Sequence, residues 1–131
     1  MAITKKAGRQ EVISARVDFT FGTGADVPLI GVYPAIDVPQ GAVVVSGFVY
    51  VSDATTATVD INIGDGGSST RYVAAVDGAA TGLTALVPTG YEYTAADTID
   101  VAITVADPAA AGAATLVVNY VVDGRAAFSQ G

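Results

Sequence analysis

The chain has 131 residues, of which 51% are hydrophobic and 15% are charged, and its formal net charge is −7. It contains neither cysteine nor histidine. This excludes disulfides, thiolate or imidazole metal ligands, and any catalytic triad that depends on histidine or cysteine. The length suits one domain with one ordinary hydrophobic core. We therefore expect no enzyme activity, no catalytic residues, no bound metal and no cofactor.

The charge is divided unevenly along the chain. Residues 1–16 carry four basic residues and one acid, whereas the remainder carries two arginines and twelve acids. A basic arm over residues 1–10, with Lys5, Lys6 and Arg9, is expected to contact an acidic partner surface. The alternative is a solvated chain end without a partner. The acidic remainder argues against nucleic-acid binding, which depends on clustered lysine and arginine.

Apolar runs are short throughout the chain. None approaches the roughly 20 residues that a membrane-spanning helix needs. Residues 1–6 turn polar at once and lack the apolar centre of a signal peptide. We therefore expect a soluble protein, made in the cytoplasm and without a membrane partner.

The first predicted strand covers residues 12–21, where apolar and polar side chains alternate. Its apolar face consists of Ile13, Ala15, Val17, Phe19 and Phe21. Residues 27–38 contain Pro28 and Pro34, which cannot donate a hydrogen bond to a neighbouring strand. That segment is therefore predicted to be an edge strand or an extended connection. Residues 39–41 predict a tight turn.

Two further strands are predicted before the middle of the chain. Residues 42–52 are largely apolar on both faces, which predicts a central strand or a strand with one face against a partner. Gly47 within it predicts a bulge or a close approach of two backbones. Residues 58–63 alternate cleanly, with Asp60 and Asn62 on the polar face, and predict a half-buried strand.

The second half of the chain continues with shorter segments. Strands are predicted over residues 71–76, 83–87, 91–94, 98–106 and 115–122. Asp100 and Ala102 are expected on the solvent side of their strand. Residues 109–114 are expected to form a loop, because Pro108 and Gly112 leave too few residues for a stable helix.

These segments together predict an all-β fold, a jelly-roll-like β-sandwich of about eight antiparallel strands. The sandwich is expected to occupy residues 11–126 as a single domain. It would follow the arm of residues 1–10 and precede a tail at 127–131.

The loop over residues 64–70 is the most chemically suggestive stretch, with three glycines, an aspartate and three hydroxyl residues. A phosphate-binding loop needs a lysine and a following helix, and neither is indicated here. The spacing excludes an EF-hand, because its twelfth position would be Arg71 in place of glutamate. A calcium site of another geometry, with Asp65, Asp77 or Asp97, is one interpretation. The other is a hairpin loop whose polar side chains bond their own backbone.

Tyr91 and Tyr93 are expected to lie on one face of their segment. Paired tyrosines can stack on sugars or form a protein interface, because each joins an apolar ring to a polar hydroxyl. The alternative is ordinary half-buried packing in a sheet.

Several segments resemble the small head decoration, or cement, proteins of tailed bacteriophages. They read Ile63-Gly64-Asp65-Gly66, Arg71-Tyr72-Val73-Ala74-Ala75, Leu83-Thr84-Ala85-Leu86, Pro88-Thr89-Gly90-Tyr91, Tyr93-Thr94-Ala95-Ala96-Asp97-Thr98-Ile99 and Val118-Asn119-Tyr120-Val121-Val122-Asp123-Gly124-Arg125-Ala126. Their order and spacing over most of the chain carry the resemblance, and the first forty residues match less well.

The resemblance implies a virion protein on the outer capsid surface, made in the host cytoplasm. It would bind the major capsid protein and stabilise contacts between its subunits. It would also be a homo-oligomer, for which we favour a dimer over a trimer. The candidate contacts with the capsid or another partner are Lys5, Lys6, Arg9, Asp65, Arg71, Tyr91, Tyr93, Arg125 and Phe128. The alternative is a head-fibre or tail-associated carbohydrate-binding module that uses the two tyrosines and the loop over residues 64–70.

Overall fold

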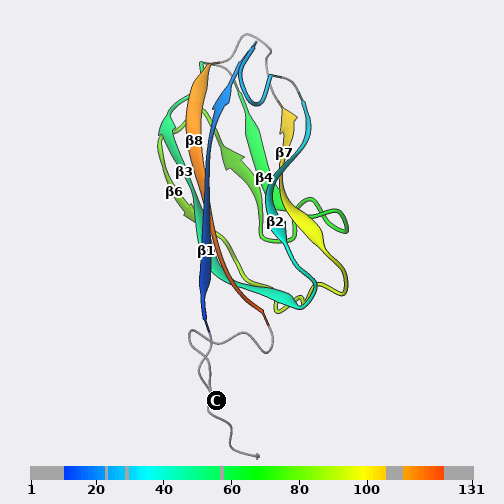
Figure 1. Cartoon of the computed structure of the whole chain (residues 1–131). Helices are drawn as coiled ribbons and strands as arrows, with labels where there is room; N and C mark the ends of the chain where they lie inside the picture. Colours follow the sequence, from blue (N-terminus) through cyan, green and yellow to red (C-terminus); the bar gives the residue numbers. More distant parts are fainter. Residues whose placement is uncertain (1–10, 23, 29, 57, 106–110, 123–131) are drawn as a thin grey trace, which may run out of the picture.

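The structure is a computed structural model that describes residues 11–22, 24–28, 30–56, 58–105 and 111–122. These residues form eight strands and no helix (Figure 1). The strands are β1 (Ile13–Phe21), β2 (Gly31–Val38), β3 (Ala42–Asp53), β4 (Asp60–Gly64), β5 (Val73–Asp77), β6 (Gly82–Ala85), β7 (Asp97–Val105) and β8 (Gly112–Val122). In this part of the chain there is accordingly no helix long and apolar enough to cross a membrane.

The strands pair into two four-stranded antiparallel sheets, which Figure 1 shows as two layers. One sheet has the order β1-β8-β3-β6 and the other has the order β2-β7-β4-β5. The pairs are nested along the chain, since β1 pairs with β8, β2 with β7, β3 with β6 and β4 with β5. This nesting is the double-sheet jelly roll. The predicted all-β sandwich is confirmed, and β2 is an edge strand as its prolines predicted.

The core lies between the two sheets and follows from alternation along each strand. Phe19 and Leu116 come from one sheet, Ile61 and Ile99 from the other, and all four are buried. Each fully buried aliphatic or aromatic side chain stabilises the fold by roughly 1.5–3 kcal/mol. The apolar face predicted for the first strand does point inward, and it becomes most deeply buried at Phe19 and Phe21.

β3 changes the face that it buries partway along its length. Its buried side chains are Ala42 and Val44 in the first part, and Val49 and Val51 in the second. The change accompanies a shift in register with β8 between Val44 and Ser46. In consequence Phe48 and Tyr50 project from the outer side of the sheet, which is why both faces of this strand are apolar in the sequence.

Gly47 sits directly after this irregularity. Its φ is 153°, and a Cβ at this position would lie 2.3 Å from the carbonyl oxygen of Val117 on the neighbouring strand. Backbones approach this closely only where one residue is glycine. The predicted bulge or close approach at Gly47 is confirmed, and so is the central position of β3 between β8 and β6.

Two predicted element limits were wrong. Residues 91–94 form only an isolated bridge, in which Glu92 pairs with Val43 near the start of β3. Gly112, Ala113 and Ala114 belong to β8 and not to a loop, since they pair with the end of β1. Residues 109 and 110 of that predicted loop lie outside the described residues.

Three predicted solvent-facing side chains, Asn62, Asp100 and Ala102, are instead buried. Asn62 Oδ1 accepts a hydrogen bond of 2.7 Å from the backbone N–H of Ala75, where β5 bulges against β4. Asp100 accepts one from the hydroxyl of Thr98. Burial raises the pKa of Asp100, the Thr98 hydrogen bond partly lowers it, and the nearby Asp97 and Asp65 raise it further. The outer side of this sheet is therefore only partly exposed to solvent.

Candidate functional site

The loop between β4 and β5 is closed by its own backbone. A Cβ at Gly64 would lie 2.1 Å from the carbonyl oxygen of Ser68, so the tight turn requires glycine. The Asp65 amide donates to that same oxygen at 2.9 Å. In return, Asp65 Oδ1 accepts the backbone N–H groups of Gly67 and Ser68 at 2.9 and 3.0 Å. The interpretation as a loop whose polar side chain bonds its own backbone is confirmed.

Asp65 also binds groups that lie further along the chain. The Arg71 guanidinium donates to both carboxylate oxygens, and the Tyr93 hydroxyl donates to Oδ2 at 2.8 Å. The Tyr93 hydroxyl in turn lies 2.7 Å from the hydroxyl of Tyr72. Asp65 is 4% exposed and Tyr93 is 2% exposed, so the network is closed off from solvent.

Arg71 completes the group by covering an aromatic ring. Its Cζ lies 3.7 Å from the centroid of Tyr91, a cation–π contact. The rings of Tyr91 and Tyr93 meet edge to face, with centroids 5.1 Å apart. The structure thus brings together four residues that the sequence singled out separately. We call Asp65, Arg71, Tyr72, Tyr91 and Tyr93 the Asp65 cluster.

The electrostatics of the Asp65 cluster fix its protonation state. Burial raises the pKa of Asp65, but hydrogen bonds from Arg71, Tyr93 and the two loop N–H groups outweigh burial and hold the pKa below its ordinary value. Burial, with hydrogen bonds to Tyr72 and Asp65, raises the pKa of Tyr93 far above its ordinary value. Its hydrogen bond with Asp65 raises the pKa of Arg71. At neutral pH the cluster therefore contains an ion pair between Asp65 and Arg71 beside the neutral hydroxyl groups of Tyr72 and Tyr93. Such an arrangement is a poor source or acceptor of protons.

Two of the predicted partner contacts, Asp65 and Tyr93, are buried in the folded chain rather than exposed, because each is a hydrogen-bonded member of the network. Tyr91 is 37% exposed and has Arg71 against its ring, so the two tyrosines do not form a platform of two exposed rings. Both Asp65 oxygens are occupied by donors. Within the described ranges, no group of three or more acidic side chains could hold a metal ion.

Five predicted contacts lie outside the described residues. They are Lys5, Lys6, Arg9, Arg125 and Phe128. The contact between the basic arm and an acidic partner stays a prediction.

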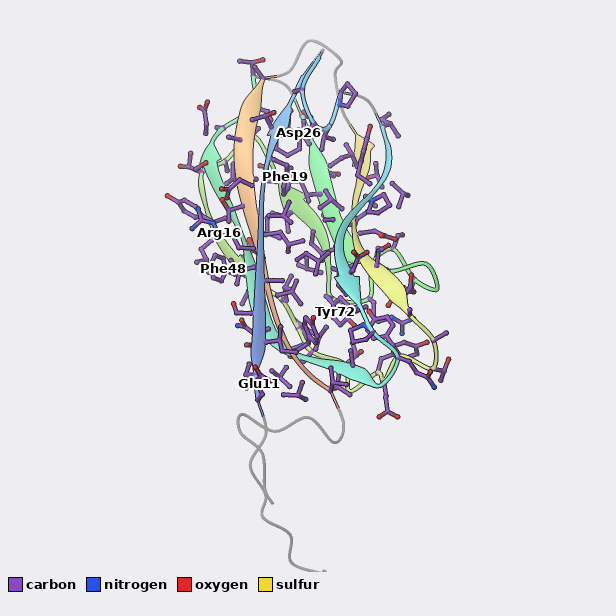
Figure 2. All side chains as sticks on the ribbon, in the orientation of Figure 1. Glu11, Arg16, Phe19, Asp26, Phe48 and Tyr72 are labelled. Atoms are coloured by element: carbon purple, nitrogen blue, oxygen red, sulfur yellow. The ribbon has the colours of Figure 1, made fainter. Side chains whose placement is uncertain are left out.

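The outer side of the sheet β1-β8-β3-β6, which we call the β3 face, is a candidate surface whose residues the sequence did not single out. Its centre is apolar and is formed by cross-strand neighbours on three strands, Phe48, Tyr50, Leu83, Ala85 and Val117. Leu83 is 61% exposed and Tyr50 is 42% exposed. Figure 2 shows Phe48 projecting on the same side of the molecule as Arg16, away from the other sheet. The available signal was the stretch of residues 42–52, which is apolar on both faces.

The outer side of the sheet β2-β7-β4-β5, which we call the β7 face, has the opposite character. Each of its strands places one aspartate there, namely Asp37, Asp60, Asp77 and Asp100. Within their described bounds these four strands contain no lysine or arginine. Asp37, Asp60 and Asp77 are at least partly exposed, whereas Asp100 is buried, so this face presents acidic side chains from three of its four strands.

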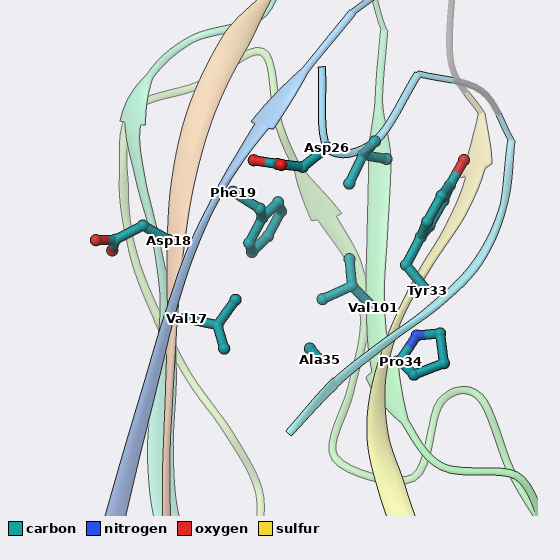
Figure 3. A pocket seen from close by; sticks show the side chains of 9 residues that line it. Val17, Asp18, Phe19, Asp26, Tyr33, Pro34, Ala35 and Val101 are labelled. Carbon is teal, nitrogen blue, oxygen red and sulfur yellow. The ribbon is translucent and has the colours of Figure 1, made fainter. Parts of the chain in front are cut away.

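A pocket of about 270 Å³ opens between the edge strands β1 and β2 (Figure 3). Its apolar lining includes Val17, Phe19, Ala35 and Val101. The Asp18 side chain points away from the pocket in Figure 3 and is bonded to Arg16 and Thr115. Asp26 accepts the backbone N–H and the hydroxyl of Thr20. Since both carboxylates are engaged elsewhere, we assign this pocket no chemistry.

Chains of the same fold occur in three solved phage capsids. The capsid asymmetric unit of cyanophage Pam1 contains a chain that matches with a TM-score of 0.68 and 21% identity, over 93% of this chain and 92% of that chain. A chain in the acidic stable capsid of Helicobacter pylori bacteriophage KHP30 matches with a TM-score of 0.61 and 20% identity, over 86% and 93%. A chain in the capsid of Ralstonia phage GP4 matches with a TM-score of 0.53 and 18% identity, over 93% and 91%. No protein-family model and no curated protein matches the chain. At these identities the likeness shows a shared fold.

Proposed function

We propose that this chain is a virion protein that binds the outside of a phage capsid and stabilises the contacts between major capsid subunits. The observation that carries the proposal is the match of the jelly roll to chains of three phage capsids, over 86–93% of its length. The match also covers 91–93% of those chains. They are therefore of about the same length as this chain.

The chemistry of the chain supports a binding role over catalysis. Without histidine or cysteine it lacks the side chains that most often activate a nucleophile or move a proton near neutral pH. In the Asp65 cluster, the buried carboxylate is fully engaged by donors. Such a cluster fixes a loop, and a rigid domain loses little entropy when it binds.

The attachment points of the two chain ends support binding to a common partner. The first residue of β1, Ile13, pairs with Tyr120, near the end of β8. The described residues that adjoin the arm with Lys5, Lys6 and Arg9 and the tail with Arg125 and Phe128 therefore lie at the same end of the domain. Contacts from both segments would reinforce each other through a high effective concentration once either is bound.

Co-sedimentation with capsids that lack the protein tests the proposal. We expect the purified full-length chain to pellet with such capsids at a fixed ratio to the major capsid protein, and to raise the temperature at which they open. Capsids of an unrelated phage are the control. A chain that stays in the supernatant would contradict the proposal. So would shells that assemble only in its presence, because the chain would then be a shell-forming subunit.

The arm is tested separately in the same assay by removal of residues 2–10. We expect at least a tenfold loss of affinity, which corresponds to about 1.4 kcal/mol. Undiminished binding would rule out the arm while leaving the proposed function intact.

A further inference from the structure

β1 is the longest edge strand in the described part of the chain. It has nine residues, pairs with β8 without a shift in register, and contains neither proline nor glycine. The other edge strands are less able to pair with a further strand. β2 contains Pro34 beside a bulge, and β5 and β6 have only five and four residues. Short length, proline and bulges are common means by which proteins block sheet edges, and β1 has none of the three.

The backbone groups of every second residue of β1 point to its free edge. Near the end of the strand this edge is closed, because the Thr20 carbonyl oxygen accepts the Val27 N–H at 2.9 Å. Since alternate residues of a strand direct their backbone groups to the same side, those of Ser14, Arg16 and Asp18 also point to the free edge. Among the described residues no strand pairs with β1 there. The edge therefore offers N–H and C=O groups at the spacing of a strand, which another extended backbone can satisfy.

The core is incompletely covered along the same side of the sandwich. Ile13, Ala15 and Val17 of β1 face inward but are only partly buried, as are Tyr33 and Ala35 of β2. Inward-facing residues of the central strands β7 and β8 are by contrast buried. A further strand beside β1 would cover this apolar strip.

The pocket beside β1 suits one apolar side chain. Its volume of about 270 Å³ lies below the roughly 300–1,000 Å³ of small-molecule sites. Val17 and Phe19 point into it from β1, and Ala35 lies opposite them on β2 (Figure 3). Asp18 and Asp26 are hydrogen-bonded within the chain, so the pocket offers an occupant its apolar lining. Because the lining includes these two acids and no base, charge complementarity favours a segment with a lysine or arginine beside its apolar residue.

We propose that the free edge of β1 binds an extended segment of the major capsid protein, which adds a strand to the sheet β1-β8-β3-β6. The segment places one apolar side chain in the pocket and a basic side chain near the two carboxylates. In strand addition of this kind, backbone hydrogen bonds supply affinity and the pocket supplies specificity. β1 of a second copy is a poorer occupant, because its inward side chains already belong to its own core. The inference rests on the proposed function and assigns the capsid contact to one edge of the domain.

Hydrogen–deuterium exchange resolved to single amides tests the proposal, on the full-length chain free and bound to capsids that lack it. We expect the amides of Ser14, Arg16 and Asp18 to exchange rapidly in the free protein and at least about tenfold more slowly on the capsid. The amides of Ala15 and Val17 point to β8 and should be protected in both states, which makes them the internal control.

The possible results separate this inference from the proposed function. Capsid binding without protection of the three edge amides overturns the inference and leaves the proposed function intact. A chain that does not bind capsids overturns both. Protection of the edge amides in the free protein also overturns the inference, because a second copy or an end of the chain would then cover the edge.

Two pairs of variants test the same edge by affinity for capsids that lack the protein. Arg16→Pro removes an N–H group from the free edge and no hydrogen bond to β8, and Arg16→Ala is its control because it keeps the N–H. We expect Arg16→Pro to bind at least about tenfold more weakly than Arg16→Ala, since a carbonyl group of the added strand then lacks its donor.

Ala35→Leu provides a second test if proline destabilises β1. Leucine would fill the pocket, and we expect about a tenfold loss of affinity because the apolar side chain of the added strand is then excluded. Val32→Leu is its control, since Val32 is 58% exposed on the outer side of the same strand. Equal affinities of each variant and its control would overturn the proposal.

Discussion

The two broad faces of this sandwich share one core but differ in what they offer to solvent. The β3 face is apolar at its centre and carries both signs of charge at its edge, in Arg16 and Asp18. The β7 face has one aspartate from each strand, and two of these, Asp60 and Asp77, are direct cross-strand neighbours. Inward-facing positions are alike in both sheets, so the difference resides entirely in the outward positions. A jelly roll can therefore be stable with either kind of face.

The two sheets also differ in the devices that fix their local geometry. On the β3 side, a glycine at a bulge lets two backbones approach and turns Phe48 and Tyr50 outward. On the β7 side, a buried carboxylate ties the loop after β4 to Arg71 and Tyr93. One device depends on the absence of a side chain and the other on a charge. They should respond differently to mutation and to pH.

Gly47→Ala should have the largest effect. The new Cβ would lie 2.3 Å from the Val117 carbonyl oxygen and 2.8 Å from a methyl group of Leu86, so the strands must separate. We expect a loss of about 4 kcal/mol in the free energy of unfolding, from backbone strain and overpacking together. Urea denaturation measures it. Gly82→Ala is the control, since Gly82 has a similar φ of 149° but no atom within 4 Å of the added Cβ. Equal losses for the two variants would refute the role of close approach.

Asp65→Asn should have the second largest effect on stability. The amide keeps the shape of the side chain but has one acceptor oxygen in place of two. The donors on one side therefore lose their partner, either the Gly67 and Ser68 N–H groups at Oδ1 or Arg71 and Tyr93 at Oδ2. We expect the free energy of unfolding to fall by about 2 kcal/mol at pH 7, which is typical of the loss of a hydrogen bond to a charged group. Asp53→Asn, at an exposed carboxylate, should change stability by less than about 0.5 kcal/mol.

The pH dependence of this loss distinguishes the ion pair from simple packing. Because the folded protein holds the pKa of Asp65 below its ordinary value, the ionised carboxylate stabilises the fold above about pH 4. This stabilisation disappears as the pH falls through the folded pKa. The gap between wild type and Asp65→Asn should therefore be constant from pH 7 to about pH 5 and close under more acidic conditions. A gap that persists at acidic pH would show that charge is not the cause.

The smallest effect is expected on the β7 face. Asp60→Lys converts a pair of opposed carboxylates into an oppositely charged cross-strand pair with Asp77. We expect the free energy of unfolding to rise by about 0.5 kcal/mol at low salt, and this gain to shrink as salt is added. Asp37→Lys, on the same face but opposite Thr98, should gain less. If both variants gain equally, the net charge of the face and not the Asp60–Asp77 pair is responsible.

Much of the fold could be predicted from the sequence because alternation is a local signal. The strand beginning at Ile13 and the strand containing Ile61 show it without interruption, and both were placed within two residues of their bounds. β3 shows the limit of that signal, because a bulge reverses which residues are buried and only the neighbouring strand specifies where. The beginning of β8 at Gly112 was missed for the same reason, since pairing with β1 overrides the low strand preference of small residues.

The candidate site was predictable as a set of residues but not as an arrangement. Asp65 was singled out in the loop over residues 64–70, Arg71 at the start of the next predicted strand, and Tyr91 and Tyr93 in the predicted strand over residues 91–94. Nothing in the sequence states that these residues meet. The hydrogen bond between Asp65 and Tyr93 joins residues 28 positions apart. This hydrogen bond forms only because the fold brings the segment that contains Tyr93 beside the loop that contains Asp65. Burial of a charged residue is likewise a tertiary property, because composition alone would place a charged side chain on the surface.

The proposed function is tested most directly by the copy number of this chain in purified virions. Quantitative mass spectrometry gives its ratio to the major capsid protein, and labelling of intact particles with a reagent that cannot enter the shell shows whether it lies outside. We expect a fixed, simple ratio and labelling of the chain in intact virions. Absence of the chain from purified virions, or its labelling only after the shells are opened, would contradict the account.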